Sequence, residues 1–103
     1  MFILLTIKYY KYLYKAESGQ CSWYESGSRT ANGEYFNPNG MTAAHKTLFF
    51  GIRVRVTSGG GSVIVRINRD LFVTGRILDL ARGAAAHLGV LSKGVFQCTV
   101  TKV

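Results

Sequence analysis

The chain has 103 residues, enough for one domain with a modest core and too few for two. Its 13 Lys and Arg residues against 5 Asp and Glu residues give a formal net charge of +8. Such a charge favours a polyanionic partner, which means nucleic acid, anionic lipid or an acidic cell-wall polymer. Ordinary apolar content and the lack of low-complexity segments exclude a disordered chain.

The first segment joins an apolar run to a basic aromatic run. Met1–Ile7 is apolar but too short to span a bilayer, and the lysines that follow it reverse the charge order of a secretory signal. We predict an atypical or truncated export segment over residues 1–18. Two alternatives stay open for residues 1–16: an extra basic aromatic strand, or a membrane-surface anchor in which Lys and Tyr interleave.

Short strand patterns separated by glycine-containing turns come next. Ser22–Tyr24 predicts a short strand, and residues 25–33 predict an exposed loop rich in Ser, Gly and Asn. Arg53–Thr57 alternates with a period of two, which places its arginines outward. Ser58–Gly61 predicts a hairpin connection to Ser62–Asn68, a strand whose valines and isoleucine at odd positions share one face.

The C-terminal third predicts two strands around one small helix. Arg76–Leu78 indicates a short strand, and Asp79 is placed to cap a helix over Leu80–Leu88 that Gly89 would end. Val95–Val103 predicts a final strand. Many short strands, tight turns and one helix favour a compact β-barrel.

Two cysteines lie near the ends of this domain. Cys21 and Cys98 would close a long loop as a disulfide in an oxidising compartment. Cys98 also alternates with apolar neighbours, so a buried free thiol is the other interpretation. No closely spaced Cys/His pair is present, which argues against a metal site.

One carboxylate and one imidazole stand out as candidate chemical groups. Glu34 and His45 lie in polar, glycine-containing segments that precede the strand-rich region. Both are free to face a cleft, where a proton donor and its partner would act on a bound substrate. Basic and aromatic residues occur throughout, but no recognised nucleic-acid-binding module does.

Several segments together resemble the RlpA-like (rare lipoprotein A) double-psi β-barrel domain. They occur in this order: Ser22–Tyr24, Thr30–Glu34, Phe36–Pro38, Met41–Leu48, Phe50–Gly51, Arg53–Thr57, Val63–Asn68 and Gly75–Leu80. The resemblance covers residues 19–103 and implies a mainly β fold, a six-stranded double-psi β-barrel with one or two short helices.

The resemblance also implies an activity and a location. Members act as endolytic peptidoglycan lytic transglycosylases, which cleave the MurNAc–GlcNAc β-1,4 bond of peptide-free glycan strands and leave 1,6-anhydro ends. The implied location is the bacterial cell envelope, with possible peripheral membrane association and possible septal cell-wall protein partners, and no cofactor is implied. The alternative is a non-catalytic, expansin-like module that binds peptidoglycan or another polysaccharide.

By position, the resemblance places the functional residues on Glu34 and His45, with a third acid directly after Asn68. Here the chain reads Arg69-Asp70-Leu71-Phe72, one residue shorter than the family's Asp-Arg-Gly-Pro-Phe, so Asp70 becomes the candidate replacement. In a strand, a slip of one residue turns a side chain to the opposite face. The expected substrate-binding residues are Trp23, Tyr24, Tyr35, Arg66 and Asn68.

Four arginines of the strand region have two possible roles. The guanidinium groups of Arg53, Arg55, Arg66 and Arg69 would attract the lactyl carboxylates of muramic acid, or would form a solvated sheet face.

Overall fold

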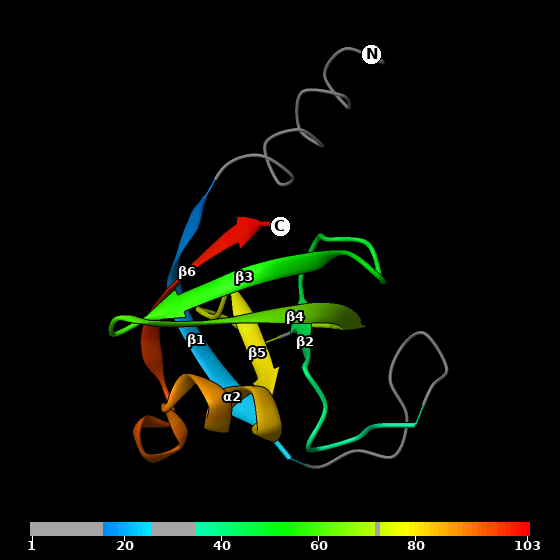
Figure 1. Cartoon of the computed structure of the whole chain (residues 1–103). Coiled ribbons are helices and arrows are strands. Elements are labelled where there is room, and N and C mark those ends of the chain that lie inside the picture. The colour runs from blue at the N-terminus through cyan, green and yellow to red at the C-terminus, as the bar shows by residue number, and fades with distance from the viewer. Residues whose placement is uncertain (1–15, 26–34, 72) are drawn as a thin grey trace.

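The computed structural model describes residues 16–25, 35–71 and 73–103 of the chain (Figure 1). These residues form strands with one helix and one 3₁₀ turn. The elements are β1 (Glu17–Tyr24), β2 (Thr42–His45), β3 (Arg53–Ser58), β4 (Gly61–Asp70), β5 (Leu78–Ala81), α2 (Arg82–Leu88), η1 (Leu91–Lys93) and β6 (Phe96–Lys102).

The described strands close into a barrel in the order β1-β5-β2-β4-β3-β6. The pairs β1–β5 and β2–β4 are parallel, and the remaining pairs are antiparallel. Strand β5 lies between β1 and β2, although it follows both of them late in the sequence. Helix α2 packs across one end of the barrel, against β4, β5 and β1 (Figure 1). The predicted mainly β barrel is confirmed.

The hairpin of β3 and β4 shows how the sequence builds the core. Alternate residues of each strand point inward, and Val54, Val56 and Ile67 are among the most buried side chains. Arg53 and Arg55 point outward, as predicted. The connecting turn needs left-handed backbone at two glycines in succession, a conformation that L side chains rarely adopt.

A disulfide joins β1 to β6, the two strands whose pairing completes the barrel. Cys21 and Cys98 are 0% and 1% exposed, and their Cα atoms lie 5.9 Å apart. The structure therefore selects the disulfide over the buried free thiol. It also links the first and last strands of the barrel through two cysteines that are 77 positions apart in the sequence.

The prediction that Asp79 caps a helix is wrong. Asp79 lies within β5, and α2 begins three residues later at Arg82, with Ala81 at the N-cap position and no side-chain cap. Leu78 and Leu80, on either side of Asp79, are fully buried, so the segment gains more by pairing with β1 and β2 than by starting a helix. The prediction that Gly89 ends the helix is correct, because its backbone is left-handed (φ 79°).

Other element boundaries differ modestly from those expected. Strand β1 begins at Glu17, well before the predicted Ser22, because its first half pairs with β6. Strand β5 lies two residues later than the strand predicted over Arg76–Leu78. In the described residues, no helix is long and apolar enough to cross a bilayer. Most of the predicted export segment lies outside the described residues.

Candidate functional site

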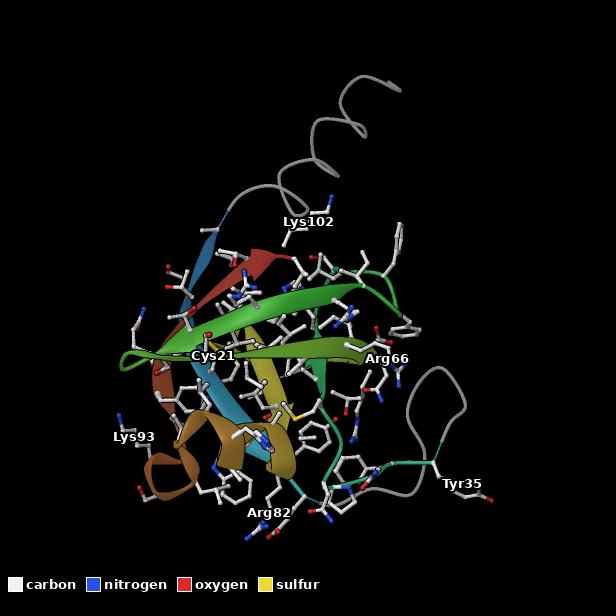
Figure 2. The ribbon with its side chains drawn as sticks, viewed as in Figure 1. Cys21, Tyr35, Arg66, Arg82, Lys93 and Lys102 are labelled. Atoms are coloured by element: carbon white, nitrogen blue, oxygen red, sulfur yellow. A yellow bond between two sulfur atoms is a disulfide. The ribbon has the colours of Figure 1, made fainter. Side chains whose placement is uncertain are left out.

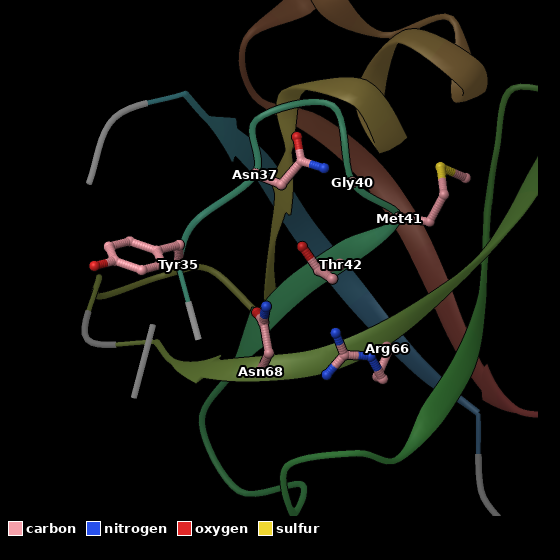
Figure 3. Close-up of a pocket in the computed structure, with 7 residues that line it drawn as sticks. All are labelled: Tyr35, Asn37, Gly40, Met41, Thr42, Arg66 and Asn68. Carbon is pink, nitrogen blue, oxygen red and sulfur yellow. The ribbon is translucent and has the colours of Figure 1, made fainter. Parts of the chain in front are cut away.

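A polar pocket of about 390 Å³ opens on the outer surface of β2 and β4 (Figure 3). Strand β2 contributes Thr42, and β4 contributes Arg66 and Asn68, while the segment that leads into β2 supplies the opposite wall. Thr42 and Arg66 are register partners in the parallel β2–β4 pair. The complete lining is Tyr35, Asn37, Gly40, Met41, Thr42, Arg66 and Asn68.

The wall formed by residues 35–41 is anchored to both β4 and α2. The amide of Arg66 donates to the carbonyl of Met41 at 3.0 Å, and the amide of Gly83 donates to the carbonyl of Pro38 at 2.6 Å. Gly83 is in the first turn of α2, so this bond also satisfies one of the helix's unpaired N-terminal donors. A Cβ atom at position 83 would lie 2.5 Å from the carbonyl oxygen of Asn39. Glycine is therefore required where the helix meets the pocket wall.

Strand β4 contains a β-bulge at Asn68, which lines the pocket. The register of β4 against β2 passes from Ala43–Ile67 to Ala44–Arg69, which leaves Asn68 as the extra residue. Asn68 is two residues after Arg66, so ordinary alternation puts both on the pocket face of β4, and the bulge instead changes the direction of the strand after Asn68. Asn68 is 2% exposed and still lines the pocket, while Arg69 continues along the outer surface.

A second group of polar side chains lies beside the pocket and is called here the Asp79 cluster: Ser22, Tyr24, Arg69 and Asp79. The hydroxyl of Ser22 donates to Oδ1 of Asp79 at 2.8 Å. Burial raises the pKa of Asp79, and this effect outweighs the Ser22 hydrogen bond and the charges of Arg69 and Arg76, which act in the opposite direction. Asp79 is therefore a carboxyl group that holds its proton to higher pH than usual.

The Asp79 cluster and the pocket share one surface. Asp79 is the register partner of Ala44, and Thr42 lies two residues before Ala44 on the same face of β2. Strand spacing and rise then put the Cα atoms of Asp79 and Thr42 roughly 8 Å apart.

Two aromatic rings connect the cluster to the pocket wall. The guanidinium of Arg69 lies 5.0 Å from the centroid of the Tyr24 ring, and Tyr24 stacks on Phe36 with centroids 5.0 Å apart. Phe36 lies between the pocket residues Tyr35 and Asn37 in sequence. Burial raises the pKa of Tyr24, although the charge of Arg69 opposes this shift.

His45 lies at the end of β2 and has partners on both ring nitrogens. Its Nδ1 accepts hydrogen bonds from the amides of Thr47 and Leu48, each at 3.1 Å. The ring proton is therefore on Nε2, which donates to Oε1 of Glu17 at 2.8 Å. At 2% exposure, His45 ties the start of β1 to the turn after β2.

The remaining predicted site residues fall in several places. Tyr35, Arg66 and Asn68 line the pocket together, and Tyr24 belongs to the neighbouring Asp79 cluster. Trp23 is partly buried against the hydrophobic core.

Of the two predicted acids, Asp70 is described and does not line the pocket. Asp70 is exposed at the end of β4 and is the register partner of His45. Glu34 lies outside the described residues, directly before Tyr35 in the sequence.

Sequence reasoning missed the pocket residues Asn37 and Thr42 and the role of Asp79 in a polar cluster. The alternation of Leu78, Asp79 and Leu80 was the available signal, because a strand with apolar residues on either side turns the middle one outward. Asn37 had no comparable local signal. Among the described residues, no group of three His, Cys, Asp or Glu side chains is arranged to hold a metal ion.

The closed barrel, with two parallel pairs and a polar pocket on its outer surface, has the fold of double-psi β-barrel domains. It superposes on the Streptomyces papain inhibitor with a TM-score of 0.74 at 20% identity, covering 86% of this chain and 94% of the inhibitor. It also superposes on an expansin of Clavibacter michiganensis in complex with cellohexaose, with a TM-score of 0.69 at 18% identity, covering 86% of this chain and 50% of the expansin. These similarities confirm the predicted fold.

Residues 16–100 match the family described as "Lytic transglycolase", and the chain belongs to this family of RlpA-like double-psi barrels. It is 53% identical over 87 residues to a probable endolytic peptidoglycan transglycosylase RlpA of Synechocystis sp., covering 79% of this chain and 27% of the relative. It is 46% identical over 84 residues to the endolytic peptidoglycan transglycosylase RlpA of Vibrio cholerae, covering 76% and 32%. The chain thus spans about a quarter to a third of these relatives.

Proposed function

We propose that this chain is an endolytic peptidoglycan lytic transglycosylase of the cell envelope. It would cleave the MurNAc–GlcNAc β-1,4 bond of peptide-free glycan strands and leave 1,6-anhydromuramyl ends. One observation carries the proposal: in a chain of this family, a pocket is lined by Tyr35, the residue directly after the expected acid Glu34, together with Arg66 and Asn68.

The reaction needs a proton donor and a proton acceptor but no water nucleophile. The C6 hydroxyl of the muramyl residue attacks C1 of the same sugar while the C1–O4 bond breaks. In this proposal Glu34 gives its proton to the departing O4. For this step Glu34 would have to carry its proton when the glycan binds, a role that a carboxyl group in a partly apolar cleft can fill.

Asp79 is proposed as the group that accepts the C6 hydroxyl proton. Its raised pKa makes it a stronger base than an ordinary carboxylate once it is ionised. The Ser22 hydroxyl fixes the orientation of one carboxylate oxygen. Asp79 also lies on the face of the sheet that carries Thr42 into the pocket.

The pocket side chains are proposed to hold the glycan. Tyr35 is 72% exposed and would stack on a sugar face, while Asn68 would hydrogen-bond sugar hydroxyls. Tyr24 would extend the aromatic surface toward Asp79. Trp23, which packs against the hydrophobic core, would support this surface rather than contact the glycan.

His45 is proposed as a positioning residue and Asp70 as a supporting acid. His45 holds the end of β2 through Glu17 and the following turn, which keeps Thr42 on the same short strand in register with β4. Asp70 lies at the adjacent end of β4.

A non-catalytic, expansin-like binding module is the second candidate function. The shortened segment that begins at Arg69 and the position of Asp70 outside the pocket lining favour it. This candidate predicts that the protein sediments with purified sacculi, that Glu34→Gln leaves binding unchanged, and that no anhydro ends form.

The deciding experiment measures anhydromuramyl ends released from peptide-free glycan strands. Wild-type protein is expected to release them, and Glu34→Gln and Asp79→Asn are each expected to lower the rate by about 100-fold or more. Asp70→Asn is expected to have a smaller effect. The matched control is Lys93→Gln, which removes a charge on the far side of the barrel from Arg66 (Figure 2). Binding by the wild-type protein without any anhydro product would overturn the enzymatic proposal.

A further inference from the structure

Arginine side chains extend the pocket surface onto β3. We call Arg53, Arg55 and Arg66 the arginine face, since all three point outward from the β3–β4 pair. Arg53 and Arg66 are direct register partners across the antiparallel pair. Residues opposite each other in such a pair have Cα atoms about 4.5–5.5 Å apart, so the two guanidinium groups start from adjacent positions.

Like charges placed directly opposite in a sheet are destabilising, and Arg53 has another arginine as its register partner. Arg55 faces Ile64 on β4 and Thr101 on β6, so no acid stands opposite it. Within the described part of the chain, neither Arg53 nor Arg55 forms an ion pair or a side-chain hydrogen bond. By contrast, Arg82 pairs with Glu25 at 3.3 Å.

The arginine face is continuous with the pocket. Arg66 belongs to both, and Figure 3 shows it beside Asn68 on β4, with Thr42 across from them on β2. The start of β3 is held against the same part of β4, because the amide of Ile67 donates to the carbonyl of Ile52 at 2.8 Å. A glycan that lies in the pocket would therefore meet Arg53 as it leaves the pocket.

We propose that the arginine face binds the free lactyl carboxylates of muramyl residues, an inference that rests on the proposed function. A guanidinium group matches a carboxylate in shape and donates two parallel hydrogen bonds to it. A stem peptide converts that carboxylate into an amide, which removes the negative charge and adds bulk. The arginine face thus gives a physical reason why this chain would select peptide-free strands.

The test compares two fluorescently labelled ligands, peptide-free glycan strands and the same strands after amidation of their carboxylates. Binding is measured by anisotropy in the Glu34→Gln background, so that cleavage does not affect the result. The unmodified arginine face is expected to bind the carboxylate strands about fivefold more tightly than the amidated strands, the size expected for an exposed charge pair. Arg53→Gln and Arg55→Gln are each expected to reduce this preference, and the double variant, which keeps only Arg66 of the arginine face, to reduce it most.

Two controls separate recognition from general charge effects. Lys93→Gln removes the same charge elsewhere and should keep the preference. Arg53→Lys keeps the charge without the planar fork, so it should keep only part of the preference. Thermal unfolding of each variant checks that these exposed substitutions leave the fold intact.

The outcomes distinguish this inference from the proposed function. Equal binding of both ligands by the unmodified arginine face, or a preference that the double arginine variant leaves undiminished, overturns the inference whether or not anhydro ends are formed. An arginine-dependent preference in a protein that yields no anhydro ends supports the inference and rejects the enzymatic function. A loss of preference in Lys93→Gln as large as in Arg53→Gln also overturns it, because the effect would then follow net charge.

Discussion

Two regions of this barrel satisfy their polar groups in different ways. At the closure between β1 and β6, Cys21 and Cys98 are joined covalently in the core. Nearby, both nitrogens of His45 have partners. On the outer surface of β2, β4 and β5, Asp79 has a raised pKa, because the effect of burial outweighs the hydrogen bond and the positive charges that favour its ionised form.

The two regions are therefore expected to contribute differently, the closure to stability and the outer surface to binding and proton transfer. Buried polar groups that are fully hydrogen-bonded fix a fold, whereas a partly buried carboxyl group with incomplete compensation has an altered affinity for protons. Changes at the closure should therefore lower the free energy of unfolding. Changes on the outer surface should alter substrate binding and proton transfer at a smaller cost in stability.

The largest effect is expected from removing the disulfide. The double variant Cys21→Ala and Cys98→Ala should lose about 4 kcal/mol of unfolding free energy, because the link closes a loop of 77 residues in the unfolded chain. Urea unfolding measures this loss, and wild-type protein under reducing conditions is the control. The anhydro-product rate per folded molecule should not change. A stability loss below about 1 kcal/mol would contradict the assignment of this region to stability.

His45→Ala is expected to have the next largest effect, about 3 kcal/mol, since it empties a buried position and leaves the amides of Thr47 and Leu48 without their acceptor. Thermal and urea unfolding measure the loss. Glu17→Gln is the matched control, because an amide oxygen still accepts from Nε2, and should cost about 1 kcal/mol.

The positioning role of His45 has its own readout. With activity normalised to the folded fraction, His45→Ala should raise the KM for glycan and leave the shape of the pH–rate profile unchanged. A changed profile at unchanged stability would instead place His45 among the proton-transfer groups.

Gly83→Ala is expected to lower both stability and glycan affinity, because it changes the contact between α2 and the pocket wall. Its methyl group would meet the backbone of Asn39, which must move, at a cost of about 2 kcal/mol. Glycan affinity should fall with it, as measured by anisotropy. Ala86→Gly, exposed on the same helix, should cost about 1 kcal/mol and leave glycan affinity unchanged. Equal glycan affinity in both variants would show that Gly83 does not control the pocket.

The smallest effect is expected from Ser22→Ala. The folded pKa of Asp79 lies above its ordinary value of 3.8, so between these two values the folded state holds a proton that the unfolded state has lost. Stability therefore falls as pH rises through this window. Removing the Ser22 hydrogen bond should raise the folded pKa further and extend the window upward, with a loss of about 1 kcal/mol at neutral pH.

Urea unfolding across the acid-to-neutral range measures this dependence, and the acidic limb of the pH–rate profile should move the same way. Asp79→Asn is the control, because it removes the titrating group and should flatten the dependence in that window. A Ser22→Ala profile that coincides with wild type would show that the hydroxyl does not tune Asp79.

Local pattern was enough for the β3–β4 hairpin. Alternation from Arg53 to Ile67 set which side chains enter the core, and successive glycines allowed the turn, as the structure confirms. The resemblance added the double-psi barrel, and with it Tyr35, Arg66 and Asn68 as a group, which the structure places around one pocket.

The sequence by itself thus determined the strand faces, the hairpin turn and the family, because these follow from neighbouring residues and from ordered motifs. Only the tertiary structure decided that Asp79 belongs to a strand, that Asn68 sits in a bulge and that Cys21 meets Cys98. Each of these depends on which distant segments pair when the barrel closes. Burial and strand pairing between distant segments decide this, and they override what the local sequence pattern predicts.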